Sequence, residues 1–65
     1  MDDLPRAERI VAEAQSNVVR QRAIVARLER QGLDARAAQD LLAHFEVTLR
    51  STEDRLARIQ QGLAS

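Results

Sequence analysis

The chain has 65 residues with no cysteine, one proline, two glycines and one aromatic residue, and its ten arginines balance ten acidic residues. This length accommodates a single domain, so residues 1–65 form one predicted unit. A domain this small buries only roughly 60% of the surface that its unfolded form exposes, so it usually needs a disulfide, a metal or a partner chain. Without cysteine, and with His44 as the one histidine, disulfides and a structural zinc site are excluded. No metal or cofactor is expected. Of the three means of stabilising so small a domain, only a partner chain is left.

The sequence favours a cytoplasmic protein and argues against a membrane or nucleic acid as partner. The longest stretch without Asp, Glu, Lys or Arg, residues 59–65, is far shorter than the roughly 20 apolar residues of a membrane-spanning helix. The start Met1-Asp2-Asp3 is acidic, whereas a secretory signal begins with basic residues. A formal net charge of zero lacks the positive footprint of general nucleic-acid binders.

The first predicted helix spans residues 5–30 and follows a flexible segment, residues 1–4. Pro5 suits the first helical position, because its missing N–H would have no partner there, and Leu4 before it suits the cap. At the other end, Gly32 suits the left-handed position that follows a helix. Residues 31–34 therefore form the predicted interhelical turn.

The second predicted helix spans residues 35–61. Asp34 suits its N-cap, and Gly62-Leu63 repeats the stop signal of Gly32-Leu33, so residues 62–65 are expected to form a C-terminal tail. Two helices of similar length with so short a connection must lie side by side and antiparallel. The predicted fold is therefore all-α, a two-helix antiparallel hairpin.

Apolar residues recur every seven positions in both predicted helices, a period typical of near-parallel helices that supercoil. If the hairpin folds about its turn, facing residues have numbers that sum to about 66, which places Gln21 opposite Phe45 and Ala14 opposite Thr52. Gln21 is expected to hydrogen-bond to a side chain across the bundle. The predicted packing core, shared by the hairpin and its dimer, consists of Val11, Ala14, Val18, Gln21, Val25, Leu28, Leu42, Phe45, Leu49, Thr52, Leu56 and Ile59.

Ile10, Asn17 and Ile24 widen the stripe of the first helix beyond what one neighbouring helix can cover. Apolar surface left in water usually marks an association surface. We therefore expect a homodimer that forms a four-helix bundle, with the two turns at the same end or at opposite ends. Asn17 and Thr48 fall near the midpoint of the hairpin, where they form either a polar interface layer that sets the register or a partly solvated edge. The expected function is a small helical interaction or regulatory module with a protein-binding face.

Two alternative functions remain open. Arg20, Arg27 and Arg30 lie close together on the first helix and can hold RNA phosphates, as in an RNA-binding regulator. The same charges also complement the helix dipoles and the acidic half of the second helix, which is the simpler interpretation. The other alternative is a small accessory subunit of a larger complex.

An enzyme is not expected, because a thin hairpin offers no pocket with a positioned catalytic group. His44 has no second histidine or cysteine with which to bind metal or carry out nucleophilic chemistry. Asp40 precedes His44 by four residues, so the two side chains are predicted to form a surface pair.

Several stretches between about residues 8 and 59 also carry a resemblance to other short proteins. They are Val19-Arg20-Gln21-Arg22, Val25-Ala26-Arg27-Leu28-Glu29, Gly32-Leu33-Asp34 and Leu41-Leu42-Ala43-His44-Phe45-Glu46, followed by Leu49, Arg55 and Leu56. In these stretches the chain resembles a group of very short proteins of GC-rich alphaproteobacteria, whose function is unknown. The resemblance implies a bacterial helical hairpin and carries no activity, cofactor or catalytic residue to transfer.

Overall fold

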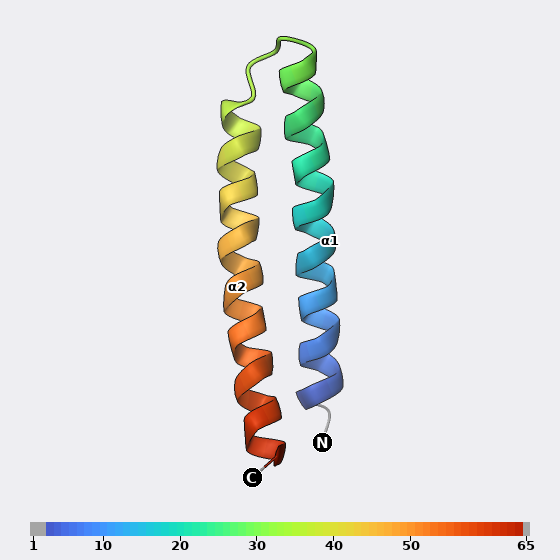
Figure 1. Ribbon diagram of the computed structural model, residues 1–65, viewed down its shortest axis with the longest axis vertical. Helices are drawn as coiled ribbons and strands as arrows, with labels where there is room; N and C mark the ends of the chain where they lie inside the picture. Colours follow the sequence, from blue (N-terminus) through green and yellow to red (C-terminus); the bar gives the residue numbers. More distant parts are fainter. Residues whose placement is uncertain (1–2, 65) are drawn as a thin grey trace.

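The computed structural model describes residues 3–64 and consists of two long helices joined by a short turn. Helices α1 (Asp3–Arg30) and α2 (Arg36–Ala64) lie side by side and run in opposite directions, so both ends of the chain lie at the same end of the rod (Figure 1). The Cα atoms extend over 52 × 14 × 13 Å. The predicted all-α, two-helix antiparallel hairpin is confirmed.

Both helices extend further toward the ends of the chain than predicted. Helix α1 begins at Asp3, so Leu4 is helical instead of forming a cap. The predicted flexible segment is therefore wrong for its last two residues, while Met1 and Asp2 lie outside the described residues. Pro5 sits in the first turn, where its missing N–H costs no intrahelical hydrogen bond.

The turn ends α1 with the hydrogen bonds of a Schellman motif. The N–H of Leu33 donates to the carbonyl of Leu28 at 2.9 Å, and the N–H of Gly32 donates to the carbonyl of Glu29 at 3.1 Å. Gly32 has a φ of 70°, in the left-handed region that glycine adopts without steric cost. The predicted stop at Gly32 is confirmed.

Asp34 provides the cap of α2, which begins at Arg36, one residue later than predicted. Its Oδ1 accepts the main-chain N–H of Arg36 at 3.0 Å, and the Arg36 guanidinium donates to both carboxylate oxygens. The guanidinium, followed by the main-chain N–H, holds the pKa of Asp34 below its usual value, and the carboxylate raises the pKa of Arg36. Ala35, predicted to be helical, belongs to the turn and is buried.

Gly62 does not end α2, which continues through it to Ala64. The predicted C-terminal tail is therefore wrong for residues 62–64, and Ser65 lies outside the described residues. Glycine permits the left-handed conformation but does not impose it. At Gly32 the chain must reverse so that α2 can pack against α1, whereas the residues after Gly62 simply extend the helix.

Replacing each glycine by alanine is expected to change stability in opposite directions. Gly32→Ala should lower the free energy of unfolding by about 1–2 kcal/mol, because a Cβ disfavours the left-handed conformation although nothing lies within 4 Å of its position. Gly62→Ala should raise the free energy of unfolding by at most about 1 kcal/mol, because alanine is the better helix former. Urea titration of both variants checks this pair, and destabilisation by Gly62→Ala would contradict a helical Gly62.

The two helices are offset along their length relative to the prediction. Figure 1 shows that α2 begins further from the apex of the hairpin than α1 ends, because residues 33–35 run back along the molecule before the helix starts. Gln21 accordingly donates to the main-chain carbonyl of Ala38 at 3.0 Å, not to a side chain at the level of Phe45. The predicted rule, that the numbers of facing residues sum to about 66, places Ala38 opposite Leu28. Leu28 lies nearer the turn than Gln21, which Ala38 contacts instead.

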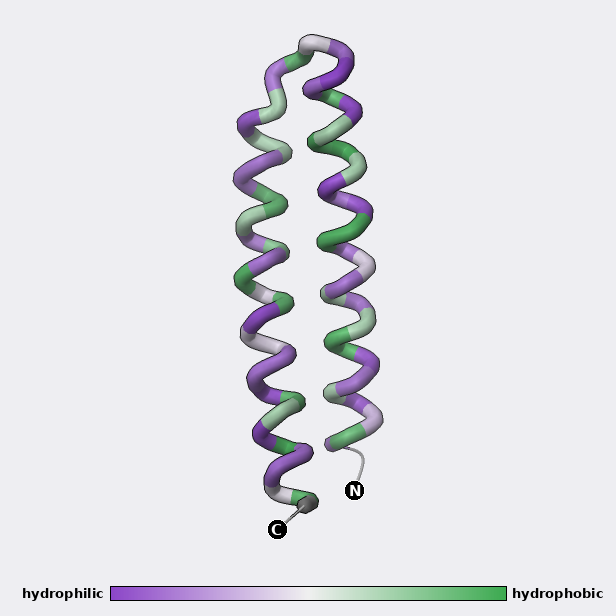
Figure 2. The backbone as a smooth tube through the Cα atoms, viewed as in Figure 1, coloured by the Kyte–Doolittle hydropathy of each residue, from purple (hydrophilic) through white to green (hydrophobic). Residues whose placement is uncertain are grey.

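The contact between the helices buries small side chains. On α1 the buried residues lie on one stripe that faces α2: Ala7, Val11, Ala14, Val18, Gln21 and Val25, with Leu28 half-buried. On α2 the facing residues are only half-buried: Ala38, Leu42, Phe45, Leu49, Thr52, Leu56 and Ile59. Figure 2 shows hydrophobic segments recurring along the facing edges of both helices. Every buried apolar residue in the described part of the chain is alanine or valine, so the hairpin leaves its larger apolar side chains partly exposed.

Candidate interaction surface

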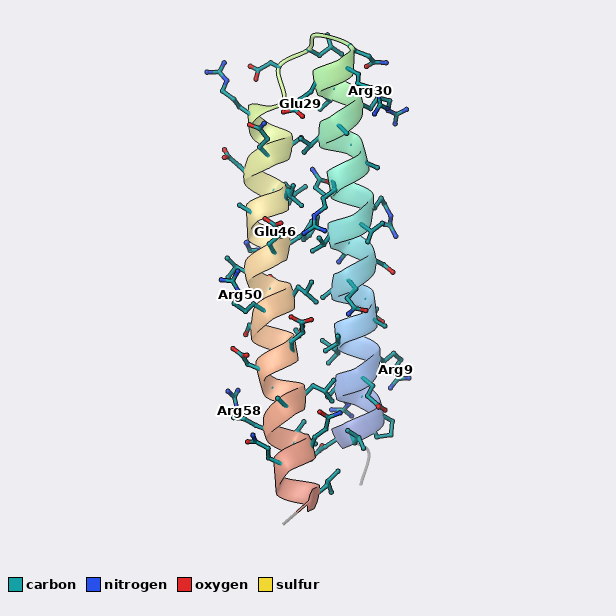
Figure 3. The ribbon with its side chains drawn as sticks, viewed as in Figure 1. Arg9, Glu29, Arg30, Glu46, Arg50 and Arg58 are labelled. Atoms are coloured by element: carbon teal, nitrogen blue, oxygen red, sulfur yellow. The ribbon has the colours of Figure 1, made fainter. Side chains whose placement is uncertain are left out.

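One long side of the hairpin is spanned by polar contacts between the helices. Arg22 Nη2 lies 3.2 Å from Glu46 Oε2, and Gln39 Nε2 donates to Glu29 Oε2 at 3.0 Å. Figure 3 shows Glu29 and Glu46 between the two helices. We term this side the bridged face. Its ion pair is too exposed to contribute more than about 1 kcal/mol, so these contacts align the helices more than they stabilise them.

The opposite long side is termed the open face. It is defined by two rows of side chains at intervals of seven residues: Ile10, Asn17 and Ile24 on α1, and Leu41, Thr48 and Arg55 on α2. Each row follows one line along its helix, because seven residues are close to two turns. Ile10 and Arg55 line the same cleft, which places the two rows next to each other. Ile24 lies about 200° around α1 from Arg22, so this side is opposite the bridged face.

The open face leaves apolar surface in water. Ile10 is 41% exposed and Leu41 is 43% exposed, while Ile24 is half-buried. Of the two residues predicted to form a polar layer, Asn17 is half-buried and Thr48 is exposed, and the described residues include no hydrogen bond between them. The apolar stripe of α1 is thus wider than the area that α2 covers.

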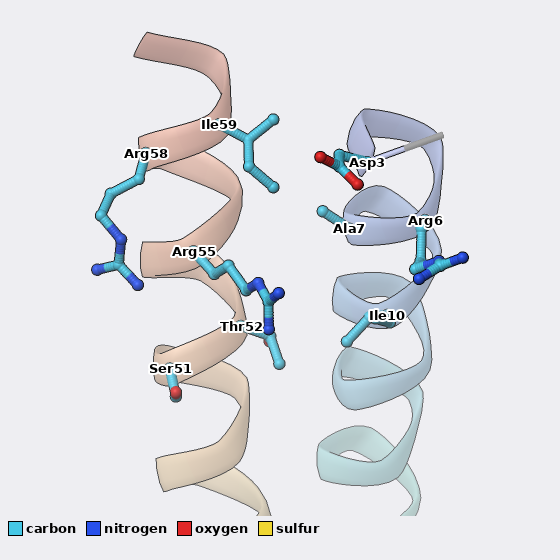
Figure 4. A pocket seen from close by; sticks show the side chains of 9 residues that line it. All are labelled: Asp3, Arg6, Ala7, Ile10, Ser51, Thr52, Arg55, Arg58 and Ile59. Carbon is cyan, nitrogen blue, oxygen red and sulfur yellow. The ribbon is translucent and has the colours of Figure 1, made fainter. Parts of the chain in front are cut away.

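A cleft of about 550 Å³ lies on the open face, at the end of the hairpin away from the turn (Figure 4). Arg6, Arg55 and Arg58 line it together with Asp3, and none of these arginines forms an ion pair within residues 3–64. In Figure 4 the Arg55 side chain reaches toward the gap between the helices, whereas Arg6 and Arg58 extend away from it. The three guanidinium groups therefore do not converge on one anion.

Sequence reasoning missed these three arginines, because Arg6 lies about fifty residues before Arg55 and Arg58 in the chain. The available signal is that an antiparallel hairpin brings the first turns of α1 beside the last turns of α2. Thr52 shares the cleft with Ala7 and Ile10, closer to the start of α1 than its predicted partner Ala14. Its hydroxyl donates to the carbonyl of Leu49 within α2, at 2.8 Å.

The predicted arginine patch is exposed. Arg20, Arg27 and Arg30 lie on the surface of α1, and their side chains form no ion pair with any described residue. Arg20 lines a shallow depression together with Glu13 and Asn17. A carboxylate therefore interrupts the positive surface beside Arg20, at the border of the open face.

His44 lies exposed beside the core, with its ring centroid 6.2 Å from that of Phe45. The predicted pair with Asp40 is not among the contacts of residues 3–64. Across the same residues, no three or more histidine, cysteine or acidic side chains gather in a way that could hold a metal ion. Neither α1 nor α2, as far as they are described, is long and apolar enough to cross a membrane.

Comparison of the chain with protein-family models, curated proteins and solved structures finds no significant match. The resemblance to short alphaproteobacterial proteins therefore stays a prediction.

Proposed function

We propose that the protein is a small interaction or regulatory module that acts through self-association. In this proposal two hairpins join through their open faces into a homodimeric four-helix bundle, and the remaining helical surface binds a protein partner. The uncovered apolar surface of the single hairpin supports the proposal most directly.

The solvent-exposed area of one chain, 5108 Å², is large for its mass. A compact monomer of 7.3 kDa is expected to expose about 4,200 Å², so the hairpin exposes about 900 Å² more. Each partner in a standard protein interface buries about 800 Å². The extra exposed area of the hairpin is therefore about as large as the area that each partner buries in one stable interface.

The composition of the core supports the same proposal. Leu42, Phe45 and Leu49 are half-buried in the single hairpin, although they are the large apolar residues with which α2 faces α1. Complete burial of a leucine or phenylalanine side chain contributes about 1.5–3 kcal/mol. A second copy on the open face would cover Ile10 and Leu41, and so would add apolar burial to a chain without disulfides.

Light scattering coupled to size exclusion tests the proposal at micromolar concentration. The expected molar mass is twice the 7.3 kDa of one chain. Ile10→Glu, which places a charge on the open face, should weaken association at least about tenfold. Val19→Glu is the matched control, because Val19 is 66% exposed and does not belong to the open face. A helical monomer at this concentration would overturn the proposal.

The RNA-binding alternative makes a different prediction for the same sample. It requires RNA affinity that falls steeply with salt and is lost when Arg20, Arg27 and Arg30 are replaced by glutamine. Self-association that is unaffected by these three replacements, without RNA affinity in the original chain, would favour the interaction module.

A further inference from the structure

We infer that the two hairpins associate antiparallel, with their turns at opposite ends of the bundle and a two-fold axis that passes between Asn17 and the partner's Asn17. This inference rests on the proposed self-association and adds its geometry. It follows from the order of residues along the open face and from the positions of unpaired charges.

The row on α1 reads the same in both directions from Asn17. Ile10 precedes Asn17 by seven residues and Ile24 follows it by seven. A two-fold axis at Asn17 with antiparallel helices therefore places Ile10 against the partner's Ile24, and the reverse contact is identical. The two Asn17 side chains meet at the axis, where each amide can donate one hydrogen bond to the other and accept one.

Charges that border this row are complementary under the same rotation. Glu13 and Arg20 share one depression with Asn17, four residues before it and three residues after it. In an antiparallel pair the same border of each helix meets, so Glu13 lies near the partner's Arg20 twice in each dimer. Neither residue has an ion-pair partner among the described residues of its own chain.

The cleft argues against the other arrangement, with both turns at one end. That arrangement would bring together the two clefts, each lined by Arg6, Arg55 and Arg58 with one carboxylate, Asp3. Like charges placed in contact across an interface disfavour the complex. The antiparallel arrangement moves the two clefts to opposite ends of the bundle and places each near the turn end of the other copy.

Disulfide crosslinking tests the inference, because the chain contains no cysteine of its own. Under mild oxidation Asn17→Cys should form covalent dimers with itself, since this position lies at the axis. A disulfide requires Cα atoms about 4.4–6.8 Å apart, so Val19→Cys and Val47→Cys, on outer surfaces, are the controls and should stay monomeric on a non-reducing gel.

The same experiment separates failure of the geometry from failure of self-association. With both turns at one end, α1 would lie over α2 of the partner, so Asn17→Cys would not crosslink with itself. That result, with a dimeric mass under reducing conditions, would overturn the antiparallel geometry and leave self-association intact. A monomeric mass would overturn the proposed function itself.

Discussion

Replacing Leu49 by aspartate is expected to abolish both the helical fold and self-association. Leu49 lies half-buried between the helices, at the centre of the apolar row of α2. The change removes about 1.5–3 kcal/mol of apolar burial and adds the cost of placing a carboxylate against apolar side chains. A domain of 65 residues has a total stability of only about 3–10 kcal/mol, so this loss is a large part of it.

Val47→Asp is the matched control for Leu49→Asp. Val47 lies two residues earlier on the same helix and is 63% exposed, so the same charge there should change stability by less than about 0.5 kcal/mol. Far-UV circular dichroism and light scattering measure helicity and mass. If Leu49→Asp kept the helicity and mass of the original chain, the assignment of the α2 core would be wrong.

Replacing Gln21 by glutamate is expected to produce the second large effect. Gln21 is 6% exposed, and its amide donates to the carbonyl of Ala38. A carboxylate has the same shape but cannot donate, so it would face the carbonyl oxygen without a hydrogen bond. The free energy of unfolding at pH 7 should fall by about 2–3 kcal/mol, as for other buried polar groups that lose their partner.

The effect of Gln21→Glu should depend on pH in a defined direction. Burial raises the pKa of the introduced carboxyl above its unfolded value of about 4.3. Its protonated form donates a hydrogen bond, so the variant regains stability below about pH 4.3 and loses it as the pH rises through the folded pKa. Urea titrations at pH 7 and pH 4, each compared with the original chain at the same pH, measure this difference.

Gln21→Leu separates the charge from the hydrogen bond. Leucine fills a similar volume without a polar group, and the Ala38 carbonyl remains within the hydrogen-bonded backbone of α2. We expect stability within about 1.5 kcal/mol of the original chain. Equal destabilisation by leucine and glutamate, independent of pH, would show that shape alone governs this position.

The helices and their turn were predictable because the signals act within one or two turns of chain. The left-handed preference of Gly32 and the cap at Asp34 need only neighbouring residues, and both function as expected. Gly62 shows the limit of such rules. It has the same neighbours as Gly32, glutamine before and leucine after, yet it lies within a helix.

The offset between the helices was not predictable from the heptad period. The same rows of apolar residues can interlock at several levels, and the conformation of residues 33–35 selects one of them. This offset brings Gln21 to the carbonyl of Ala38, and it sets which residues of α2 join Arg6 in the cleft.

The candidate interaction surface depends both on spacing along the chain and on contacts between distant residues. Spacing along the chain establishes that Ile10, Asn17 and Ile24 form one row, because a helix repeats its faces every seven residues or so. Spacing does not establish on which side α2 closes against α1. That choice depends on contacts between distant residues, such as Arg22 with Glu46, whose long side chains reach across one side and leave the row of Asn17 open on the other.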